Sequence, residues 1–519
     1  KIFETSSKES EGMIIRELYQ NPARRFSERT GIVSGNVRYT FKECEKRINQ
    51  LINGLMELGL QKGDRVAIID SNKPWYLQLY FGITGGGMIA VPLNYRLAPR
   101  EYVYLLNQSG AKAVCVGEDY VQTINSIRDQ VPEVEHFICP TFSDGYISFE
   151  ELLQGASDQQ PDVPISENDL ATLGFTSGTT GLPKGAKISH KNIIQNAMNY
   201  LIELPLYPSD VCYNHFPMFH CGGYSLMGYY GRGLTQVYDD FALQSAFEVI
   251  EREKINYWYV PAGALAFVPG FSEHESYDVS SVRVIYTGGS ATRNAVVESL
   301  FKMFPNLQSL HDIYGLTECT ASVVARTITR GMLPQLDQIG EHCGPECFGV
   351  HARLVDDDDR DVPDGELGEV VVQSETTCQG YWDNPEETEK LLRNGWLHTG
   401  DIGRFDELRN LYIVDRKKDM ILSGGENIAS AEVENAIYMH PKVAEIAVIA
   451  RPDPKWGEAV HAVVVPLPGE EITEQEIIDF CKQNIASYKK PKSVELMDAL
   501  PRNPTGKVLK KDLRARFQA

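Results

Sequence analysis

The sequence has little positive charge, no paired cysteines of the metal-binding kind and no Walker A motif. Its 50 lysines and arginines stand against 71 acidic residues, and the net charge of −21 repels a polyanion. Nucleic acid is therefore excluded as an expected partner. The ten cysteines include no C-x-x-C pair, which argues against a zinc knuckle or a disulfide framework. Reduced thiols of this kind predict a cytoplasmic compartment.

Long apolar runs are also missing. Residues 75–95 carry no charge, but four glycines and Pro92 interrupt them, so a buried helix followed by a strand fits better than a membrane span. The polar residues 1–12 lack the apolar core of a signal peptide. We expect no integral membrane segment.

What is present is ordinary globular composition in a chain too long for one core. The 519 residues are 42% hydrophobic and 23% charged, which predicts two or more domains. Short β-branched runs alternate with helical patterns at 41–58 and 472–485, and this alternation predicts α/β layers with largely parallel sheets. The runs are 65–69, 113–116, 282–286, 369–373 and 444–450.

A domain boundary is expected where the strand-like run 411–414 meets the basic cluster 416–418. About 100 residues follow this cluster, enough for a small domain. We predict an N-terminal domain over residues 1–416 and a C-terminal domain over 417–519. The acidic run 356–359 predicts a solvated turn between two strands.

The most informative motif is TSGTTGLPKG at residues 176–185, after the mostly apolar run 170–175. Its four hydroxyls, three glycines and one lysine supply donors and one cation, which is the chemistry that holds a polyphosphate. The sequence contains no G-x-x-x-x-G-K-[ST], so kinases and GTPases of the P-loop type are disfavoured.

Four further motifs follow in a fixed order. They are YGLTE at 314–318, GELGE at 365–369, HTGD at 398–401 and PTGK at 504–507. Together with the loop they resemble the adenylate-forming superfamily, and among its members the AMP-forming acyl-CoA and aryl-CoA ligases most. This superfamily also contains nonribosomal adenylation domains and firefly luciferase. The resemblance spans nearly the whole chain and implies a large multi-layer α/β domain with a small mobile α+β C-terminal domain.

The resemblance implies two reactions at one site. A carboxylate and ATP form an acyl-adenylate and pyrophosphate, and coenzyme A then takes the acyl group while AMP leaves. Because a carboxylate attacks a negatively charged phosphate, cations and oriented donors must neutralise the transition state. The implied cofactors are ATP, Mg²⁺ and coenzyme A. The implied catalytic residues are Lys184, His220, Thr317, Glu318 and Lys507.

The resemblance also implies the ligand contacts. Thr176 and Glu318 would bind the metal, Asp401 would accept hydrogen bonds from the ribose, and Lys507 would bridge the acid carboxylate and the α-phosphate. The implied ATP and AMP contacts are Thr176, Ser177, Gly178, Thr179, Thr180, Lys184, Gly289, Ser290, Ala291, Asp312, Tyr314, Gly315, Thr317, Asp401, Ile413, Arg416 and Lys507.

Lys418 resembles the pivot about which the superfamily rotates its small domain between the two reactions. One face of that domain would deliver Lys507, and the opposite face would form the thiol channel. Ser423, Gly424 and Gly425 resemble the loop of that channel. The pair Ala429-Ser430 departs from the aromatic–proline pair that is common there.

Two positions restrict which carboxylic acids are expected as substrates. Nonribosomal domains place an aspartate near the position of His220 to pair with an ammonium group, so an α-amino acid is disfavoured here. Acetate-specific relatives carry tryptophan at the position of Gly315, and the glycine predicts an acid larger than propionate. Nine of the 25 tyrosines lie in residues 200–259, either around an acyl pocket or as ordinary core.

We therefore predict an AMP-forming ligase for a medium-to-long-chain or aromatic carboxylate, with His220 gating the carboxylate channel. A stand-alone enzyme that loads a carrier-protein phosphopantetheine would use the same motifs and remains an alternative. A non-catalytic acyl or nucleotide sensor is disfavoured because Lys184, Glu318, Asp401 and Lys507 are all present. A homodimer is left open.

Overall fold

The computed structural model describes residues 12–141, 143–176, 182–239, 242–363, 365–424, 426–502 and 507–517. The chain forms two compact units. Unit 1 is Lys1–Ala352 with Val372–Leu397, and unit 2 is Arg353–Val371 with His398–Ala519. This division differs from the expected boundary at residue 417, because residues 398–416 group with the C-terminal part. The functional domain boundary stays a prediction.

The first sheet of unit 1 has seven strands in the order β7-β6-β5-β3-β4-β8-β9. All neighbouring pairs are parallel except β8 and β9, which are antiparallel. Val91, Val114 and Leu173 belong to one buried core cluster on this sheet. The strands are β3 (Arg65–Ile69), β4 (Ile89–Pro92), β5 (Ala111–Val116), β6 (His136–Cys139), β7 (Ile147–Ser148), β8 (Leu170–Thr176) and β9 (Lys184–Ser189).

The second sheet of unit 1 has eight strands in the order β15-β14-β13-β12-β10-β11-β1-β2. Its two outer pairs, β14 with β15 and β1 with β2, are antiparallel, and the inner strands are parallel. The strands are β1 (Thr30–Ser34), β2 (Val37–Thr40), β10 (Val211–Asn214), β11 (Thr235–Val237), β12 (Tyr257–Tyr259), β13 (Val284–Gly288), β14 (Ser309–Tyr314) and β15 (Val324–Thr329).

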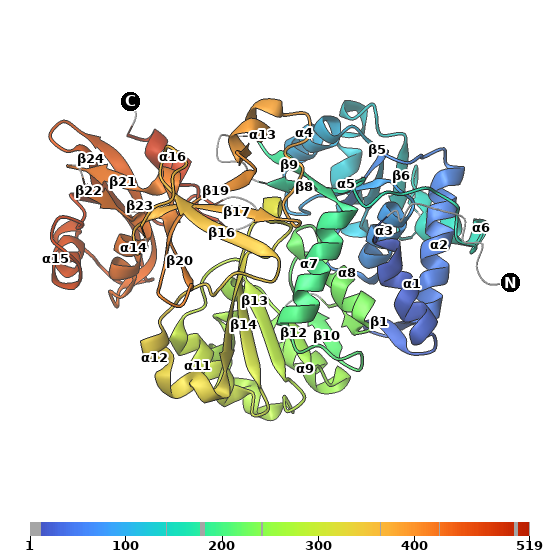
Figure 1. Cartoon of the computed structure of the whole chain (residues 1–519), viewed down its shortest axis with the longest axis horizontal. Helices are drawn as coiled ribbons and strands as arrows, with labels where there is room; N and C mark the ends of the chain where they lie inside the picture. Colours follow the sequence, from blue (N-terminus) through green and yellow to red (C-terminus); the bar gives the residue numbers. More distant parts are fainter. Residues whose placement is uncertain are drawn as a thin grey trace. The chain divides into compact units, whose positions relative to one another are not determined.

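Helices pack on these sheets through apolar faces. Phe247 of α9 and Leu300 of α11 join one core cluster with Trp258 and Leu310 of the sheet, and Figure 1 shows both helices beside β12–β14. Helix α2 begins with a capping box, in which Glu43 N donates to Thr40 Oγ1 (3.1 Å) and Thr40 N donates to Glu43 Oε2 (2.7 Å).

The helices described in unit 1 are α1 (Arg16–Arg25), α2 (Phe41–Glu57), α3 (Pro74–Gly85), α4 (Pro99–Ser109), α5 (Val121–Asn125), α6 (Phe149–Gly155), α7 (His190–Glu203), α8 (Cys221–Arg232), α9 (Leu243–Glu253), α10 (Ala262–Leu265), α11 (Asn294–Met303), α12 (Leu336–Ile339) and α13 (Pro385–Leu391).

Unit 2 contains a sheet in the order β22-β21-β24-β23, with β25 parallel to β24 and the other pairs antiparallel. Val433 of α14 and Ile477 of α15 enter its core cluster. The elements are β21 (Ile421–Ser423), β22 (Glu426–Ile428), α14 (Ser430–Tyr438), β23 (Val443–Asp453), β24 (Gly457–Pro466), α15 (Glu474–Asn484), β25 (Ser493–Leu496) and α16 (Lys510–Ala515).

A five-stranded sheet has the order β16-β17-β19-β18, with β20 on β19. Its strands are β16 (Val350–Val355), β17 (Gly368–Ser374), β18 (Leu392–Arg393), β19 (Trp396–Phe405) and β20 (Leu411–Arg416). The division between the units falls within β16, β17 and β19. In unit 2, β19 and β20 are antiparallel, with Asp401 opposite Arg416.

The α/β class expected from the sequence is confirmed by mixed sheets in unit 1 and an α+β unit 2, while the mobility of the C-terminal part stays a prediction. The uncharged residues 75–95 form α3 and β4, as predicted, and within the described residues no helix combines the length and apolarity needed to cross a membrane. The sheet of unit 2 is not parallel, because β23 and β24 form a long hairpin.

The acidic run 356–359 forms a turn directly after β16, and residues 356–358 are exposed, as the sequence predicts. Asp357 pairs with Lys417 (Nζ to Oδ1, 2.7 Å), and Asp359 lies 3.6 Å from Nε2 of the buried His398. Asp357 is 88% exposed even in its ion pair, so these contacts lie within a solvated turn and the prediction is confirmed.

Candidate active site

The antiparallel pairing of β8 and β9 places Thr176 directly opposite Lys184. Thr176 Oγ1 donates a hydrogen bond to the Lys184 carbonyl oxygen (3.5 Å), and Tyr104 donates to the Pro183 carbonyl oxygen (3.2 Å). Lys184 forms an ion pair with Glu387, and its side chain is only 11% exposed. Strand pairing thus fixes Thr176 and Lys184, one on each side of the predicted phosphate loop. The predicted contacts Ser177, Gly178, Thr179 and Thr180 lie outside the described residues.

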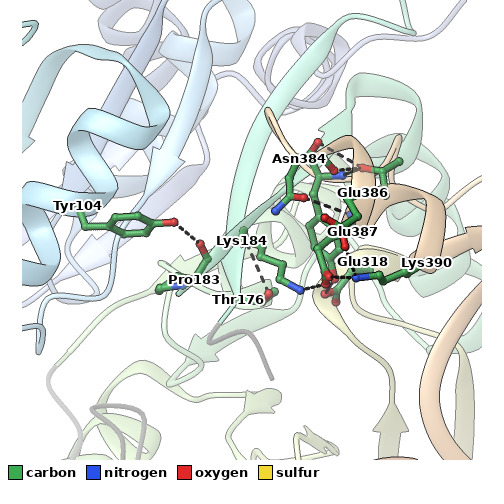
Figure 2. A network of polar contacts seen from close by, with 11 residues as sticks. Tyr104, Thr176, Pro183, Lys184, Glu318, Asn384, Glu386, Glu387 and Lys390 are labelled. Carbon is green, nitrogen blue, oxygen red and sulfur yellow. Dashed lines mark hydrogen bonds and ion pairs between the residues drawn. The ribbon is translucent and has the colours of Figure 1, made fainter. Parts of the chain in front are cut away.

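Glu318 lies in the short helix η5 (Thr317–Cys319), where the whole turn is buried. Its Oε1 atom accepts a hydrogen bond from the Tyr381 hydroxyl (2.7 Å), and its carbonyl oxygen accepts one from Cys378 N (2.8 Å). The Lys184 ammonium lies 5.4 Å from the centre of the Tyr381 ring. Figure 2 shows Lys184 pointing toward Glu387 and Glu318 and away from Tyr104. The structure therefore brings together the predicted cation and the predicted metal carboxylate.

The side chains of Glu318 and Thr176 can be compared with the oxygen ligands that Mg²⁺ prefers. No group of three or more His, Cys, Asp or Glu side chains in the described ranges forms a metal cage. Mg²⁺ is commonly held by one or two carboxylates together with substrate phosphates, so a single oriented carboxylate fits it. Glu318 supplies such a carboxylate, and Thr176 supplies a nearby hydroxyl. The ligand set itself stays a prediction.

The predicted adenine-side segment follows β13. Gly289, Ser290 and Ala291 are exposed, and no atom lies within 4 Å of where a Cβ of Gly289 would be. This open backbone leaves room for a flat ring. Asp312 Oδ2 accepts a hydrogen bond from Thr292 N (2.9 Å), which holds the segment after Ala291 in place. Burial raises the pKa of Asp312. Its contact with the nucleotide stays a prediction.

Gly315 follows Tyr314 at the end of β14, and its missing side chain is occupied by backbone. A Cβ at Gly315 would lie 1.4 Å from the carbonyl oxygen of Ala321. Thr320 and Ala321 have φ values of 51° and 94°, so the loop is strained where it approaches the glycine. The position of a Gly315 side chain is therefore filled by the loop that carries Glu318, and an acid larger than propionate stays a prediction.

Gly315→Ala is expected to destabilise unit 1 by about 1–3 kcal/mol, since the added methyl must displace backbone rather than a flexible side chain. Pyrophosphate release should fall with it, because Thr317 and Glu318 share the displaced loop. Denaturant unfolding would measure the first effect. Gly331→Ala is the matched control, since no atom lies within 4 Å of its Cβ position and its φ is not positive. Equal stability of both variants would contradict this account of Gly315.

Five buried tyrosines form what we call the tyrosine cluster: Tyr200, Tyr229, Tyr257, Tyr259 and Tyr286. The rings of Tyr200 and Tyr286 lie 5.5 Å apart, and those of Tyr259 and Tyr286 lie 4.7 Å apart. Tyr257 donates to the Tyr229 hydroxyl (3.2 Å). Burial raises the pKa of Tyr200 to about 12, so this phenol is neutral at pH 7.

The tyrosine cluster is joined to the loop of Glu318. Ser322, four residues after Glu318, donates to the Tyr200 hydroxyl (2.9 Å), and Ser225 of α8 lies 3.0 Å from the same hydroxyl. The strands that carry Tyr259 and Tyr286 are parallel to β14 and end at the same edge. The exposed His220 precedes α8, and its Nδ1 atom lies 3.1 Å from Cys221 Sγ.

Unit 2 carries the remaining predicted nucleotide contacts. Asp401 is 3% exposed, and its Oδ1 atom pairs with Arg416 Nε at 2.8 Å. Arg416 also donates to the Thr399 carbonyl oxygen (3.3 Å). Ile413 lies opposite Gly403 on the same strand pair. Lys507 is exposed.

The predicted pivot lies in the helix η7 (Lys417–Asp419), directly after β20. Burial lowers the pKa of Lys418, because the charged ammonium group loses surrounding water. Asp419 opposes this change, and the neighbouring Arg416 and Arg514 lower the pKa further. Asp415, three residues earlier, accepts hydrogen bonds at Oδ2 from Ser430 N (2.5 Å) and Ser430 Oγ (2.7 Å). The two residues flanking the predicted pivot segment are thus joined in this structure.

The predicted thiol loop is partly described. Gly424 N donates to the Trp456 carbonyl oxygen (2.9 Å), and a Cβ at Gly424 would lie 2.7 Å from the Trp456 ring. Ser423 ends β21, while Gly425 lies outside the described residues.

Sequence reasoning missed three residues at these sites: Tyr381, Glu387 and Trp456. The run Asn384-Pro385-Glu386-Glu387 is typical of a helix start, and Asn384 does cap α13 through Glu387 N (3.2 Å). That signal predicts a helix. It says nothing of the side chain 203 residues away that Glu387 contacts.

Comparison with known proteins completes the description. Residues 19–382 match the model of the AMP-binding enzyme family, and residues 432–507 match the AMP-binding enzyme C-terminal domain. A feruloyl-CoA synthase from an Amycolatopsis species is 34% identical over 95% of this chain and 97% of its own length. The long-chain-fatty-acid–CoA ligase FadD13 of Mycobacterium tuberculosis is 34% identical over 94% of both chains. The solved anthranilate CoA ligase AuaEII, in complex with anthranoyl-AMP, superposes with a TM-score of 0.86 at 27% identity over 97% of both chains.

Proposed function

The chain belongs to the AMP-binding enzyme family and is an ATP-dependent acid–CoA ligase, and within that activity we propose that its acid is an aromatic carboxylate carrying a hydrogen-bonding ring substituent. The observation that carries this proposal is the tyrosine cluster, which is joined through Ser322 to the loop of Glu318. A medium-to-long-chain carboxylate is the second candidate, which the likeness to a long-chain-fatty-acid–CoA ligase favours.

The tyrosine cluster supports an aromatic acid for two physical reasons. Tyrosine faces pack well against a planar ring, in offset or edge-to-face arrangements. Their hydroxyls, which bond to Ser322, to Ser225 and to one another, form a polar network that a ring hydroxyl could join and an alkyl chain could not. Burial, followed by neighbouring thiol and phenol groups and Glu318, raises the pKa of Tyr224 of α8, so this phenol is neutral at pH 7. The likeness to a feruloyl-CoA synthase points the same way.

The proposed residue roles follow the two reactions. Lys184 holds the outer phosphates of ATP, and Lys507 neutralises charge between the attacking carboxylate and the α-phosphate. Asp401, held by Arg416, receives the ribose hydroxyls. Mg²⁺, when bound by Glu318 and Thr176, supplies charge neutralisation on the phosphates. The small domain then turns about Lys418 so that coenzyme A can reach the acyl group.

The proposal is tested by exchange of labelled pyrophosphate into ATP with three acids: 4-hydroxycinnamate, cinnamate and dodecanoate. We expect kcat/KM to be highest for 4-hydroxycinnamate, roughly fivefold to tenfold above cinnamate, which is the effect of about 1 kcal/mol from one neutral hydrogen bond. Tyr200→Phe should remove that preference while keeping exchange with cinnamate. Thioester formation is then compared with free coenzyme A and with a phosphopantetheinylated carrier protein.

Preference for dodecanoate over both aromatic acids would contradict the aromatic proposal and favour the second candidate. Transfer to the carrier protein but not to coenzyme A would support the carrier-loading alternative.

A further inference from the structure

The segment from Gly380 to Lys390 contacts both charged groups to which the phosphate chemistry is assigned. Tyr381 donates to Glu318 Oε1 (2.7 Å), and Glu387 is the ion-pair partner of Lys184. Figure 2 shows Glu387 of α13 reaching Lys184 at the end of the β8–β9 hairpin. We call residues 380–390 the bracket segment.

The bracket segment is held rigidly against the strand that carries Lys184. Gly380 accepts a hydrogen bond from Lys187 N (2.9 Å), and Trp382 N donates to the Gly185 carbonyl oxygen (2.8 Å), so the segment extends the pairing of β9. Thr388 Oγ1 accepts from Tyr381 N (2.8 Å) and donates to the Asn384 carbonyl oxygen (2.8 Å). This threonine locks the turn to the helix, so Tyr381 and Glu387 keep a fixed relation to β9.

The charges of the bracket segment are arranged around Lys184. The side chains of Lys184 and Glu387 are 11% and 21% exposed, so solvent screens this pair less than a surface pair. Glu387 also accepts from Lys390 at 2.8 Å through its other oxygen. The hydrogen bond from Lys184, and then that from Lys390, lower the pKa of Glu387, so it is ionised at pH 7 and holds the ammonium in one orientation.

We propose that Glu387 and Tyr381 are positioning residues for the nucleotide, in which Glu387 orients Lys184 toward the ATP phosphates and Tyr381 orients Glu318 toward the metal. This inference rests on the proposed function, because it needs Lys184 and Glu318 to act on a nucleotide. Groups that orient a ligand-binding side chain typically change affinity or activity by about 10- to 100-fold when they are removed. Neither residue touches the acid, so their effects should be confined to the nucleotide and its metal.

The test compares Glu387→Gln with Glu386→Gln. The control lies on the same helix and removes the same charge, but Glu386 is 80% exposed and pairs with Lys390 rather than Lys184. Calorimetric titration with α,β-methylene-ATP and Mg²⁺ measures binding without turnover. We expect Glu387→Gln to raise the Kd of this analogue and the KM for ATP about tenfold, with the KM for the acid unchanged. Glu387→Asp should recover part of the affinity, and Glu386→Gln should match the parent.

Tyr381→Phe tests the second half of the proposal. It removes one hydroxyl and keeps the ring near Lys184, so we expect the Mg²⁺ concentration needed for half-maximal analogue binding to rise about threefold to tenfold. Analogue binding without Mg²⁺ should not change. A variant that binds Mg²⁺ and analogue as the parent does would overturn the role of Tyr381.

The outcomes for Glu387→Gln distinguish a failure of the positioning role from a failure of the proposed function. If the parent exchanges pyrophosphate and Glu387→Gln binds the analogue as tightly as the parent or more tightly, the positioning role is wrong and the pair is only structural. If the parent exchanges no pyrophosphate with any acid, the proposed function itself fails. Should Glu387→Gln unfold, the affinity of Glu387→Asp decides the question, because a shortened carboxylate must still weaken nucleotide binding.

Discussion

Lys507→Ala is expected to lower pyrophosphate release by about 100- to 1000-fold, the usual loss when one preorganised donor to a developing negative charge is removed. The reason is electrostatic, because the acid carboxylate and the α-phosphate are both anionic where they must meet. Conversion of supplied acyl-adenylate to the CoA thioester should stay within about twofold of the parent. Rapid-quench measurement of the two half-reactions, each started separately, checks this result.

The matched control for Lys507 is Lys511→Ala. Lys511 is an exposed lysine of the same unit, four residues further along the chain, at the start of α16. Its removal changes the net charge equally and should leave both half-reactions unchanged. Equal loss of both half-reactions in Lys507→Ala would show that the lysine supports the fold or a shared binding step, and its assigned role would be wrong.

Lys418→Pro is expected to slow thioester formation at least tenfold while changing pyrophosphate release little. Proline fixes φ near −65° and removes an N–H group, so a residue that must change φ between two conformations can no longer do so. The side chain of Lys418 is lost at the same time. Single-turnover transfer from pre-formed acyl-adenylate to coenzyme A measures the affected step.

Lys418→Ala separates the backbone from the side chain in this experiment. It removes the same ammonium group but leaves φ free, so it should transfer the acyl group at nearly the parent rate. If the alanine variant is as slow as the proline variant, the ammonium group is needed and the pivot assignment fails. If both are as fast as the parent, no rotation at this residue limits the thiol reaction.

The α/β layering could be predicted because its signals are local. Helix α2 lies within one residue of the predicted range 41–58, since its capping residues and apolar face are adjacent in sequence. Strand β3 coincides with the predicted run 65–69. The sheet of unit 2 was not predictable in the same way, because hairpin pairing over β23 and β24 depends on a connection that the β-branched run 444–450 does not reveal.

The candidate site shows the same difference between local sequence signals and long-range contacts. Motif order identified Lys184 and Glu318 as residues of interest, but their partners Glu387 and Tyr381 come from a segment whose own pattern predicts only a helix start. Gly315 shows a contact that no motif reveals. Its missing side chain leaves room for the loop backbone at Ala321, while the acid larger than propionate stays a prediction. Sequence motifs indicate which functional groups are present, and only the folded structure shows which residues each group contacts.

The contact between Asp415 and Ser430 affects the expected rate of rotation at Lys418. These residues lie on either side of Lys418, and Lys510 further holds the Ser430 hydroxyl at 2.7 Å. Any swivel at Lys418 that parts them must first break two hydrogen bonds to a carboxylate, each contributing about 1.5–3 kcal/mol. Even one such bond is expected to lengthen the lifetime of this conformation roughly tenfold. We therefore expect Ser430, which supplies one of these bonds from its hydroxyl and the other from its backbone N–H, to slow the predicted rotation where relatives commonly carry an aromatic–proline pair.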